Sequence, residues 1–340
     1  MPCSVTALSA AISLSPSNSV LSLKSGCTYS LTAALPSISR NLTIQGNNDL
    51  ITRSNNATFT AITVNGPQVT INKLRMSDFD GAGTNPGALR NVGGTVTVTN
   101  SRFTRNEGTD GGAVQNTSNG SFTASATTFA GNEGTNGGAF HNRGGATASF
   151  SQCSFFGNEA STGGGGAIYV SSGHVSTGGT STSASGSTNF TDNETTGALG
   201  HGGAINNDGG VVTINYTNFT GNQTNGTAAD GGALNNDGGA STVTNSGFSR
   251  NFSADDGGAI YTSESLSLTS VTIATNRATD LGGGIRVTGG NLSLSTTIVS
   301  ANIAGTTGGG ISNAGGTVSL TNNSIVRFNI PNNCTGTLAC

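Results

Sequence analysis

Charged residues, and lysine above all, are scarce in this sequence. Only 9% of its 340 residues are charged, and its 13 basic residues include just two lysines, Lys24 and Lys73. A typical soluble domain has about a quarter of its residues charged. No basic stripe is present to follow a phosphate backbone, so we expect no nucleic-acid partner.

Long apolar runs are also missing. No stretch approaches the roughly eighteen apolar residues that a membrane-spanning helix needs, so we expect no transmembrane segment. The first thirty residues lack the charged and apolar regions of a signal peptide. Disorder does not fit either, because the formal charge is only -3 and apolar residues recur to the end.

One pattern recurs from about residue 80 onward. An apolar residue, two spacers and an asparagine are followed by a polar loop and then by Gly-Gly-Ala or Gly-Gly-Gly with an apolar residue. The first half occurs eight times, with asparagines 25 to 35 residues apart. The eight copies are Phe103 to Asn106, Phe129 to Asn132, Phe155 to Asn158, Phe190 to Asn193, Phe219 to Asn222, Phe248 to Asn251, Ile273 to Asn276 and Val299 to Asn302.

A repeat of this length, with period-two alternation and no helical periodicity, predicts one coil of a solenoid. Coils stacked in register place equal positions about 4.8 Å apart, so we expect Phe to stack on Phe and Asn on Asn. Asparagine tolerates left-handed backbone angles at a corner, and its amide can bond to the coils above and below. A second asparagine column recurs at Asn91, Asn116, Asn142, Asn207, Asn236 and Asn313.

We therefore predict an all-β fold, a right-handed single-stranded parallel β-helix of about twelve coils with a short helical cap at residues 5–14. A single domain is expected over residues 1–340. Residues 1–80 form the cap and the irregular first coils, residues 81–330 the regular repeats, and residues 331–340 a C-terminal tail.

The five cysteines lie mostly near the chain ends. Cys3, Cys27, Cys334 and Cys340 are candidate disulfide partners that would pin the termini, which implies an oxidising compartment. Five unpaired thiols remain the alternative. Cys153 falls on an inward position and is expected to be an inert core thiol.

The paired Gly-Gly-Ala-apolar and Phe-x-x-Asn motifs resemble the repeat of the chlamydial polymorphic outer-membrane proteins and of bacterial secreted right-handed β-helix proteins. The resemblance covers residues 80–330 and implies a location outside a bacterial cell or on its surface. The sequence departs from the chlamydial proteins after its last coil, so we do not expect autotransport.

Acidic residues form the most ordered charged pattern. A glutamate follows four of the ladder asparagines, at Glu107, Glu133, Glu159 and Glu194, and the column continues as Gln223, Phe252 and Arg277. A solvated corner is the preferred interpretation of this column, and a calcium site is the alternative.

Other polar residues give weaker signals. Asp110, Asp230 and Asp256 precede Gly pairs and are expected to serve turns. Arg102 and Arg105 share a coil with Glu107 and Asp110, the densest charged group and the candidate site for lyase chemistry. Three histidines without metal-ligand spacing are expected at the surface: His141, His174 and His201.

A hydroxylated column is expected to face outward between the apolar positions of the strands. It consists of Thr97, Thr123, Ser149, Thr213, Thr242, Ser267 and Ser293. Such a column could bind a glycan or pack against a neighbour, or it could simply reflect the strand propensity of threonine.

We predict a non-catalytic extracellular or cell-surface protein, structural or adhesive, that self-associates end to end into a fibre or laterally. No catalytic, cofactor-binding or metal-binding residues and no cofactor are assigned, and a glycan or another surface is the possible ligand. The alternative is a carbohydrate-active enzyme, a polysaccharide lyase or hydrolase, or a glycan-binding module. The main insertion, residues 171–187, contains no acid, which weakens that alternative.

Overall fold

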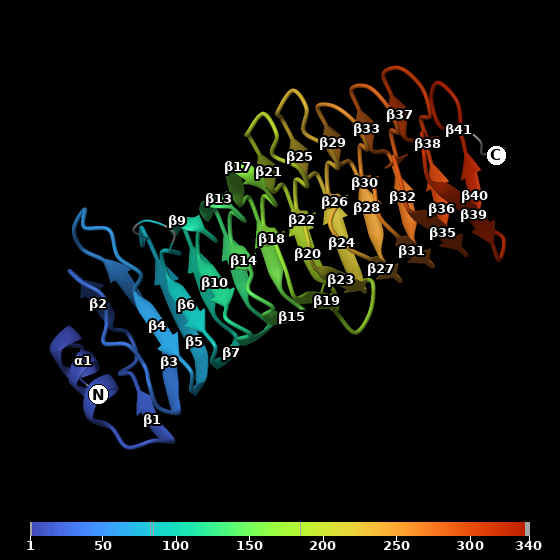
Figure 1. The fold of residues 1–340 in the computed structure, drawn as a ribbon. Helices are drawn as coiled ribbons and strands as arrows, with labels where there is room; N and C mark the ends of the chain where they lie inside the picture. The colour runs from blue at the N-terminus through green and yellow to red at the C-terminus, as the bar shows by residue number, and fades with distance from the viewer. Residues whose placement is uncertain (1, 82, 84, 184, 337–340) are drawn as a thin grey trace.

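The computed structural model describes residues 2–81, 83, 85–183 and 185–336. Within them the chain forms one helix, α1 (Val5–Leu14), and a parallel β-solenoid of about twelve turns, as predicted. The two termini lie at opposite ends of this solenoid (Figure 1). In the described part of the chain, no helix has the length and apolarity needed to cross a bilayer.

The strands form three sheets, here called A, B and C, with 22, 11 and 8 strands. A regular coil contributes two strands to sheet A, one to sheet C and one to sheet B. Sheet A contains β1 (Ser19–Ser22), β2 (Thr28–Leu31), β3 (Leu42–Arg53), β5 (Gln68–Ser77), β7 (Thr95–Thr99), β8 (Arg102–Thr104), β11 (Ser121–Ser125), β12 (Thr128–Ala130), β15 (Thr147–Ser151), β16 (Ser154–Phe156), β19 (His174–Gly178), β20 (Thr188–Thr191), β23 (Val211–Asn215), β24 (Thr217–Thr220), β27 (Ser241–Thr244), β28 (Gly247–Ser249), β31 (Leu266–Thr269), β32 (Thr272–Ala274), β35 (Asn291–Ser295), β36 (Ile298–Ser300), β39 (Thr317–Thr321) and β40 (Ile325–Arg327).

Sheets B and C are built from shorter strands. Sheet B contains β4 (Ile62–Asn65), β6 (Leu89–Val92), β10 (Val114–Thr117), β14 (Phe140–Asn142), β18 (Ile168–Val170), β22 (Ile205–Asn207), β26 (Leu234–Asn236), β30 (Ile260–Thr262), β34 (Ile285–Val287), β38 (Ile311–Asn313) and β41 (Cys334–Thr335). Sheet C contains β9 (Glu107–Asp110), β13 (Glu133–Asn136), β17 (Glu159–Gly164), β21 (Glu194–Thr195), β25 (Gln223–Thr224), β29 (Phe252–Ser253), β33 (Arg277–Ala278) and β37 (Ile303–Ala304).

The core consists of columns of like side chains, because the register of the strands keeps equivalent positions over one another. Phe103, Phe129 and Phe155 pair directly across β8, β12 and β16. Six phenylalanine rings, from Phe103 to Phe248, stack with centroids 4.6–5.1 Å apart and planes within 7° of parallel. The predicted stacking of Phe on Phe is confirmed.

An asparagine ladder runs beside the rings. The Nδ2 atom of each ladder asparagine donates to Oδ1 of the next one at 2.9–3.0 Å, from Asn106 through Asn302 to Asn329. Each Oδ1 also accepts the backbone N–H of the asparagine before it, as in the 3.0 Å bond from Asn106 to Asn132. A second ladder joins Asn91 to Asn116 at 2.8 Å and Asn116 to Asn142 at 3.0 Å.

We expected the ladder asparagine to adopt the left-handed backbone conformation at this corner. The structure instead gives that conformation to the residue before it. Arg105, Gly131, Gly157 and Arg250 have φ values of +53°, +59°, +56° and +56°. Turning the chain one residue early leaves each asparagine side chain pointing inward, where its amide can reach both neighbouring coils.

The N-terminal end of the solenoid is closed. Ser4 caps α1 by accepting a hydrogen bond from the N–H of Ala7, and Leu8 and Ile12 of the helix are buried. Cys3 and Cys27, two of the four candidate cysteines, form a disulfide with their Cα atoms 5.4 Å apart.

The other cysteines lie further along the chain. Cys334 belongs to β41, whereas Cys340 lies outside the described residues, so their pairing stays a prediction. Cys153 is a free, buried thiol, as expected, and burial raises its pKa to about 12.

Replacement of one ladder asparagine by an apolar residue tests the ladder. Asn132→Leu removes the bonds to Asn158 and to the carbonyl of Phe103, and it leaves the N–H of Asn106 unpaired. Since each unpaired buried group costs about 1–3 kcal/mol, we expect a loss of about 3 kcal/mol or more in unfolding free energy, measured by urea denaturation. Thr123→Ala, on the outer face of β11, is the control and should change stability by less than about 0.5 kcal/mol. Equal midpoints for the two variants would contradict the ladder.

Candidate functional site

The outer faces of the three sheets carry different chemistry. On sheet A the outward column is hydroxylated, as expected: Thr97, Thr123 and Ser149 pair across β7, β11 and β15. Thr213, Thr242, Ser267 and Ser293 continue this column. The column is uniform and therefore offers one kind of contact along its length.

The outer edge of sheet C carries the predicted glutamate column. Glu107, Glu133, Glu159 and Glu194 are in register, followed by Gln223, Phe252 and Arg277. Asp80 pairs with Glu107 through an isolated bridge and adds a fifth carboxylate, which the repeat could not indicate because no ladder asparagine precedes it.

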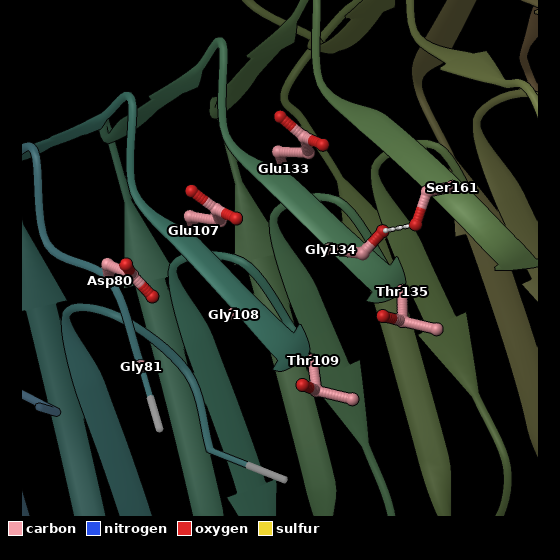
Figure 2. Close-up of a pocket in the computed structure, with 9 residues that line it drawn as sticks. All are labelled: Asp80, Gly81, Glu107, Gly108, Thr109, Glu133, Gly134, Thr135 and Ser161. Carbon is pink, nitrogen blue, oxygen red and sulfur yellow. Dashed lines mark hydrogen bonds between the residues drawn. The ribbon is translucent and has the colours of Figure 1, made fainter. Parts of the chain in front are cut away.

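Three of these acids line a shallow depression of about 110 Å³ (Figure 2). Asp80, Glu107 and Glu133 lie along one edge, and Thr109 and Thr135 lie beside them. Burial raises the pKa of Glu133, and the charges of the adjacent glutamates raise it further. Such a row of carboxylates could hold a cation, which stays the untested alternative to a solvated corner.

The predicted charged group around Arg102 and Arg105 is not assembled as expected. Arg105 pairs with Asp78 of the preceding coil, at 2.8 Å. Asp110 instead pairs with Arg143 of the following coil, at 2.6 Å. Stacking places charges from successive coils side by side, so proximity along the sequence was a poor guide here.

The outer face of sheet B has a varied row that sequence reasoning missed. The middle residues of its strands are in register and run Arg90, Gln115, His141, Tyr169, Asn206, Asn235, Tyr261, Arg286 and Ser312. No residue type recurs regularly in this row, so it left no repeated letter in the sequence. The only available signal was its constant place, two residues after each Gly-Gly-Ala or Gly-Gly-Gly.

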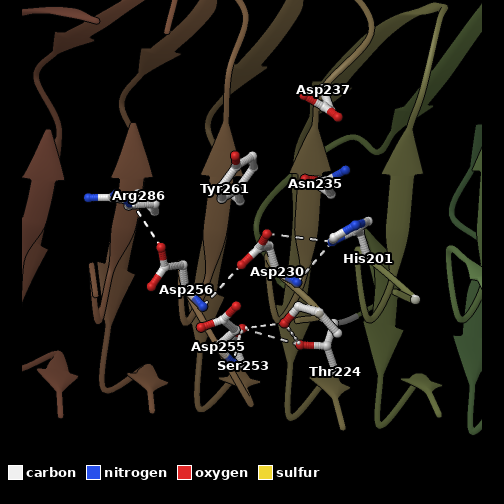
Figure 3. Close-up of polar contacts among 12 residues, drawn as sticks. His201, Thr224, Asp230, Asn235, Asp237, Ser253, Asp255, Asp256, Tyr261 and Arg286 are labelled. Carbon is white, nitrogen blue, oxygen red and sulfur yellow. Dashed lines mark hydrogen bonds and ion pairs between the residues drawn. The ribbon is translucent and has the colours of Figure 1, made fainter. Parts of the chain in front are cut away.

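A polar cluster lies beside this row (Figure 3). The His201 Nδ1 atom accepts the backbone N–H of Asp230 at 3.0 Å, and Oδ1 of Asp230 accepts that of Asp256 at 3.1 Å. Oδ1 of Asp256 accepts the N–H of Leu281 at 2.8 Å. Asp230 and Asp256 therefore bond the backbone at the Gly-Gly turns, but they tie one coil to the next instead of closing a local turn.

The remaining carboxylate oxygens of the cluster differ in their partners. Oδ2 of Asp256 forms an ion pair with Nε of Arg286 at 3.0 Å, whereas Oδ2 of Asp230 faces His201 at 3.6 Å. Burial raises the pKa of Asp230 to about 7, and the charges of Asp255 and Asp256 add to this effect. Burial also lowers the pKa of His201.

Asp255, Asp256 and Asp280 bring carboxylate oxygens within 4.8 Å of one another. Ca²⁺ takes six to eight oxygen ligands, so three carboxylates would supply only part of a calcium site. Sequence reasoning did not group these residues, because Asp280 comes from the following coil.

One of the histidine predictions is wrong. His141 was expected at the surface, but it is 4% exposed. The ring of Tyr169 lies over it with centroids 4.9 Å apart, and Asp110 and Ser171 approach its two nitrogens. His174 and His201 are partly exposed.

Two segments of the chain, residues 152–171 and 248–263, match the Chlamydia polymorphic membrane protein repeat. Each contains one Phe-x-x-Asn motif and the Gly-Gly-Ala motif that follows it. The molecule is thus a β-solenoid repeat protein. Two of its coils match the polymorphic membrane protein repeat, as the motifs predicted, and repeats of this kind suggest association with the outer membrane or cell surface. A comparison with curated proteins found no match.

The pKa of Asp230 predicts a pH-dependent stability. A carboxyl group whose pKa is raised in the folded state destabilises the fold increasingly as pH rises from about 4 to about 7. Asp230→Asn keeps an oxygen for the N–H of Asp256 and cannot ionise. We expect it to raise the unfolding free energy at pH 8 by up to about 4 kcal/mol, with no gain below pH 4, as measured by urea denaturation. The control is Asp237→Asn, which alters an exposed neighbour. Equal stability of Asp230→Asn and wild type at pH 8 would contradict the claim that ionisation of the Asp230 carboxyl destabilises the fold.

Proposed function

We propose that this chain is an extracellular, cell-surface adhesive element that binds its ligand along the outer face of sheet B. The observation that carries the proposal is the varied row of that face, in contrast to the uniform hydroxyls of sheet A. The surface association indicated by the repeats supports it.

The row offers the groups that bind a hydroxyl-rich ligand. Tyr169 and Tyr261 are partly exposed, and aromatic rings supply contact area together with a polar tip. The Tyr169 hydroxyl bonds to the exposed carboxylate of Asp208, and Asp237, which is also exposed, follows the equivalent strand one coil further on. Carboxylates accept hydrogen bonds from hydroxyls, so a glycan is the ligand class that this face fits best.

Two amides lie between the tyrosines in this row and bond to each other from one coil to the next. Nδ2 of Asn235 donates to Oδ1 of Asn206 at 2.8 Å, and both side chains are nearly fully buried. Oδ1 of Asn235 has no hydrogen-bond partner among the described residues. A rigid, preformed row costs little conformational entropy when a ligand binds.

A glycan array followed by titration calorimetry tests this proposal. We expect at least one glycan class to bind, and Tyr261→Ala to weaken its affinity about tenfold, which corresponds to about 1.4 kcal/mol. Thr242→Ala on sheet A is the matched control and should leave the affinity unchanged. A release of reducing ends during the titration would favour a carbohydrate-active enzyme instead. Binding to no glycan, or equal affinities of the two variants, would refute the adhesive row.

Self-association end to end is a second proposal, and the exposed apolar residues at both ends favour it. Phe328 and Ile330 near the C-terminal end are 74% and 59% exposed, and Leu14 and Val20 at the N-terminal end are 78% and 65% exposed. Val318 and Leu320 of the last coil are only partly buried, whereas their counterparts in earlier coils are fully buried. Apolar surface at both ends gives a head-to-tail contact a driving force.

Sedimentation velocity over a range of concentrations tests this second proposal. We expect wild type to form oligomers as the concentration rises, and the double variant Phe328→Ser, Ile330→Ser to stay monomeric because the apolar contact is lost. Leu199→Ser removes an equally exposed apolar residue, 66% exposed, from a loop far from both ends and should behave as wild type. A wild-type protein that is monomeric at every concentration would rule out end-to-end assembly.

A further inference from the structure

Three consecutive coils bring together a carboxylate at the end of a sheet C strand, an imidazole of sheet B and a hydroxyl that directly follows a sheet B strand. Asp110 ends β9, His141 is the middle residue of β14, and Ser171 directly follows β18. The Nδ1 atom of His141 lies 3.3 Å from Oδ1 of Asp110, and its Nε2 atom lies 3.0 Å from Oγ of Ser171. This is the connectivity of a nucleophile, its general base and the acid that orients the base.

The carboxylate of Asp110 is fixed and ionised. It is 5% exposed, accepts a hydrogen bond from Asn136 at 3.2 Å and pairs with Arg143 at 2.6 Å. Burial raises the pKa of Asp110, but the approach of His141, the Asn136 bond and the Arg143 charge together hold the pKa below its ordinary value.

This carboxylate sets the state of the imidazole. A negative charge beside Nδ1 favours the tautomer with its proton on Nδ1, which leaves Nε2 free to accept the proton of the serine hydroxyl. The contact of Nδ1 with Asp110 is not aligned as a hydrogen bond. Such looseness is usual in unliganded sites and is removed when substrate binds.

The backbone around Ser171 supplies the remaining component of such a site, which is a set of N–H groups that can bind an oxyanion. Its N–H donates to the carbonyl of Asn142 at 3.0 Å, which fixes the residue beside His141. The hydrogen bonds of the described backbone use neither the N–H of Ser172 nor that of Gly173. Gly173 has a left-handed φ of +84°, a conformation that helps successive N–H groups converge on an anion.

We propose that Ser171 is a nucleophile that accepts acyl groups, with His141 as its general base and Asp110 as a positioning residue. The substrate class is a carboxylic ester with a small acyl group, because Ser171 is half-buried between coils. The inference is independent of the adhesive function.

In the first step Oγ attacks the ester carbonyl carbon, and Nε2 of His141 takes the hydroxyl proton. The N–H groups of Ser172 and Gly173 stabilise the resulting oxyanion. The bond between the carbonyl carbon and the alcohol oxygen then breaks, and the alcohol leaves with the proton from His141. Water attacks the acyl-serine in the same way, which releases a carboxylic acid and restores the hydroxyl.

The proposal is tested with a fluorophosphonate probe, which phosphonylates activated serines, and with peptide mapping of the labelled residue. We expect labelling of wild type at Ser171, none in Ser171→Ala, and wild-type labelling in Ser263→Ala, a matched control that removes the hydroxyl directly after β30, which bonds to Asp237 and not to a histidine. His141→Gln should slow labelling about 100-fold or more, because the general base is lost.

Rescue separates the positioning role of Asp110 from a purely structural one. Asp110→Asn should slow labelling, since an amide no longer favours the Nδ1 proton, and Asp110→Glu should restore part of the rate. Hydrolysis of p-nitrophenyl acetate should follow the same order among the variants. Absence of labelling in folded wild type, or equal labelling of wild type and Ser171→Ala, would overturn the proposal and leave the three residues as a structural network.

Discussion

The whole molecule depends on one constraint: each coil must repeat its neighbour closely enough for buried amides to bond in register. A ladder asparagine such as Asn158 satisfies groups in the coils on both sides, so a shift of one residue would leave donors and acceptors unpaired in the interior. The flat stacking of the phenylalanine rings follows from the same register. Inward positions are therefore restricted, and the two ladders restrict them more than apolar packing alone would.

Outward positions are free of that constraint, and function is expected where they vary. The outward positions of sheet A vary little and hold a hydroxyl in nearly every coil. The row of sheet B varies more, with rings, amides, an imidazole and guanidinium groups, although Asn206, Asn235 and His141 within it are buried. Because the solenoid fixes the spacing between coils, a cluster of three groups such as Asp110, His141 and Ser171 draws one group from each of three coils.

The sequence was sufficient to predict the parts of the structure that repeat. The Phe-x-x-Asn spacing located the ring stack, the asparagine ladder and the glutamate column, because each of these recurs with a constant letter. Other parts of the sequence predicted the capping helix and gave Cys3 and Cys27 as two of the candidate disulfide partners. The burial of His141 was not predictable in the same way, since it depends on Tyr169 and Ser171, which are about thirty residues away and belong to the next coil. The ion pairs of Arg105 with Asp78 and of Asp110 with Arg143 were not predictable for the same reason, because each joins two neighbouring coils.

The first and last coils of the solenoid are held together differently, so they resist a pulling force differently. At the N-terminal end, a helix and a covalent cross-link hold the first coils together. Among the described residues, the apolar side chains of the last coil, such as Val318 and Leu320, are only partly buried. Solenoid stability is a sum of contacts between adjacent repeats, so a pulling force separates coils one at a time, and the cross-linked first coils resist it most. A solenoid built in this way would lengthen under a pulling force in small steps and would keep the remaining coils intact.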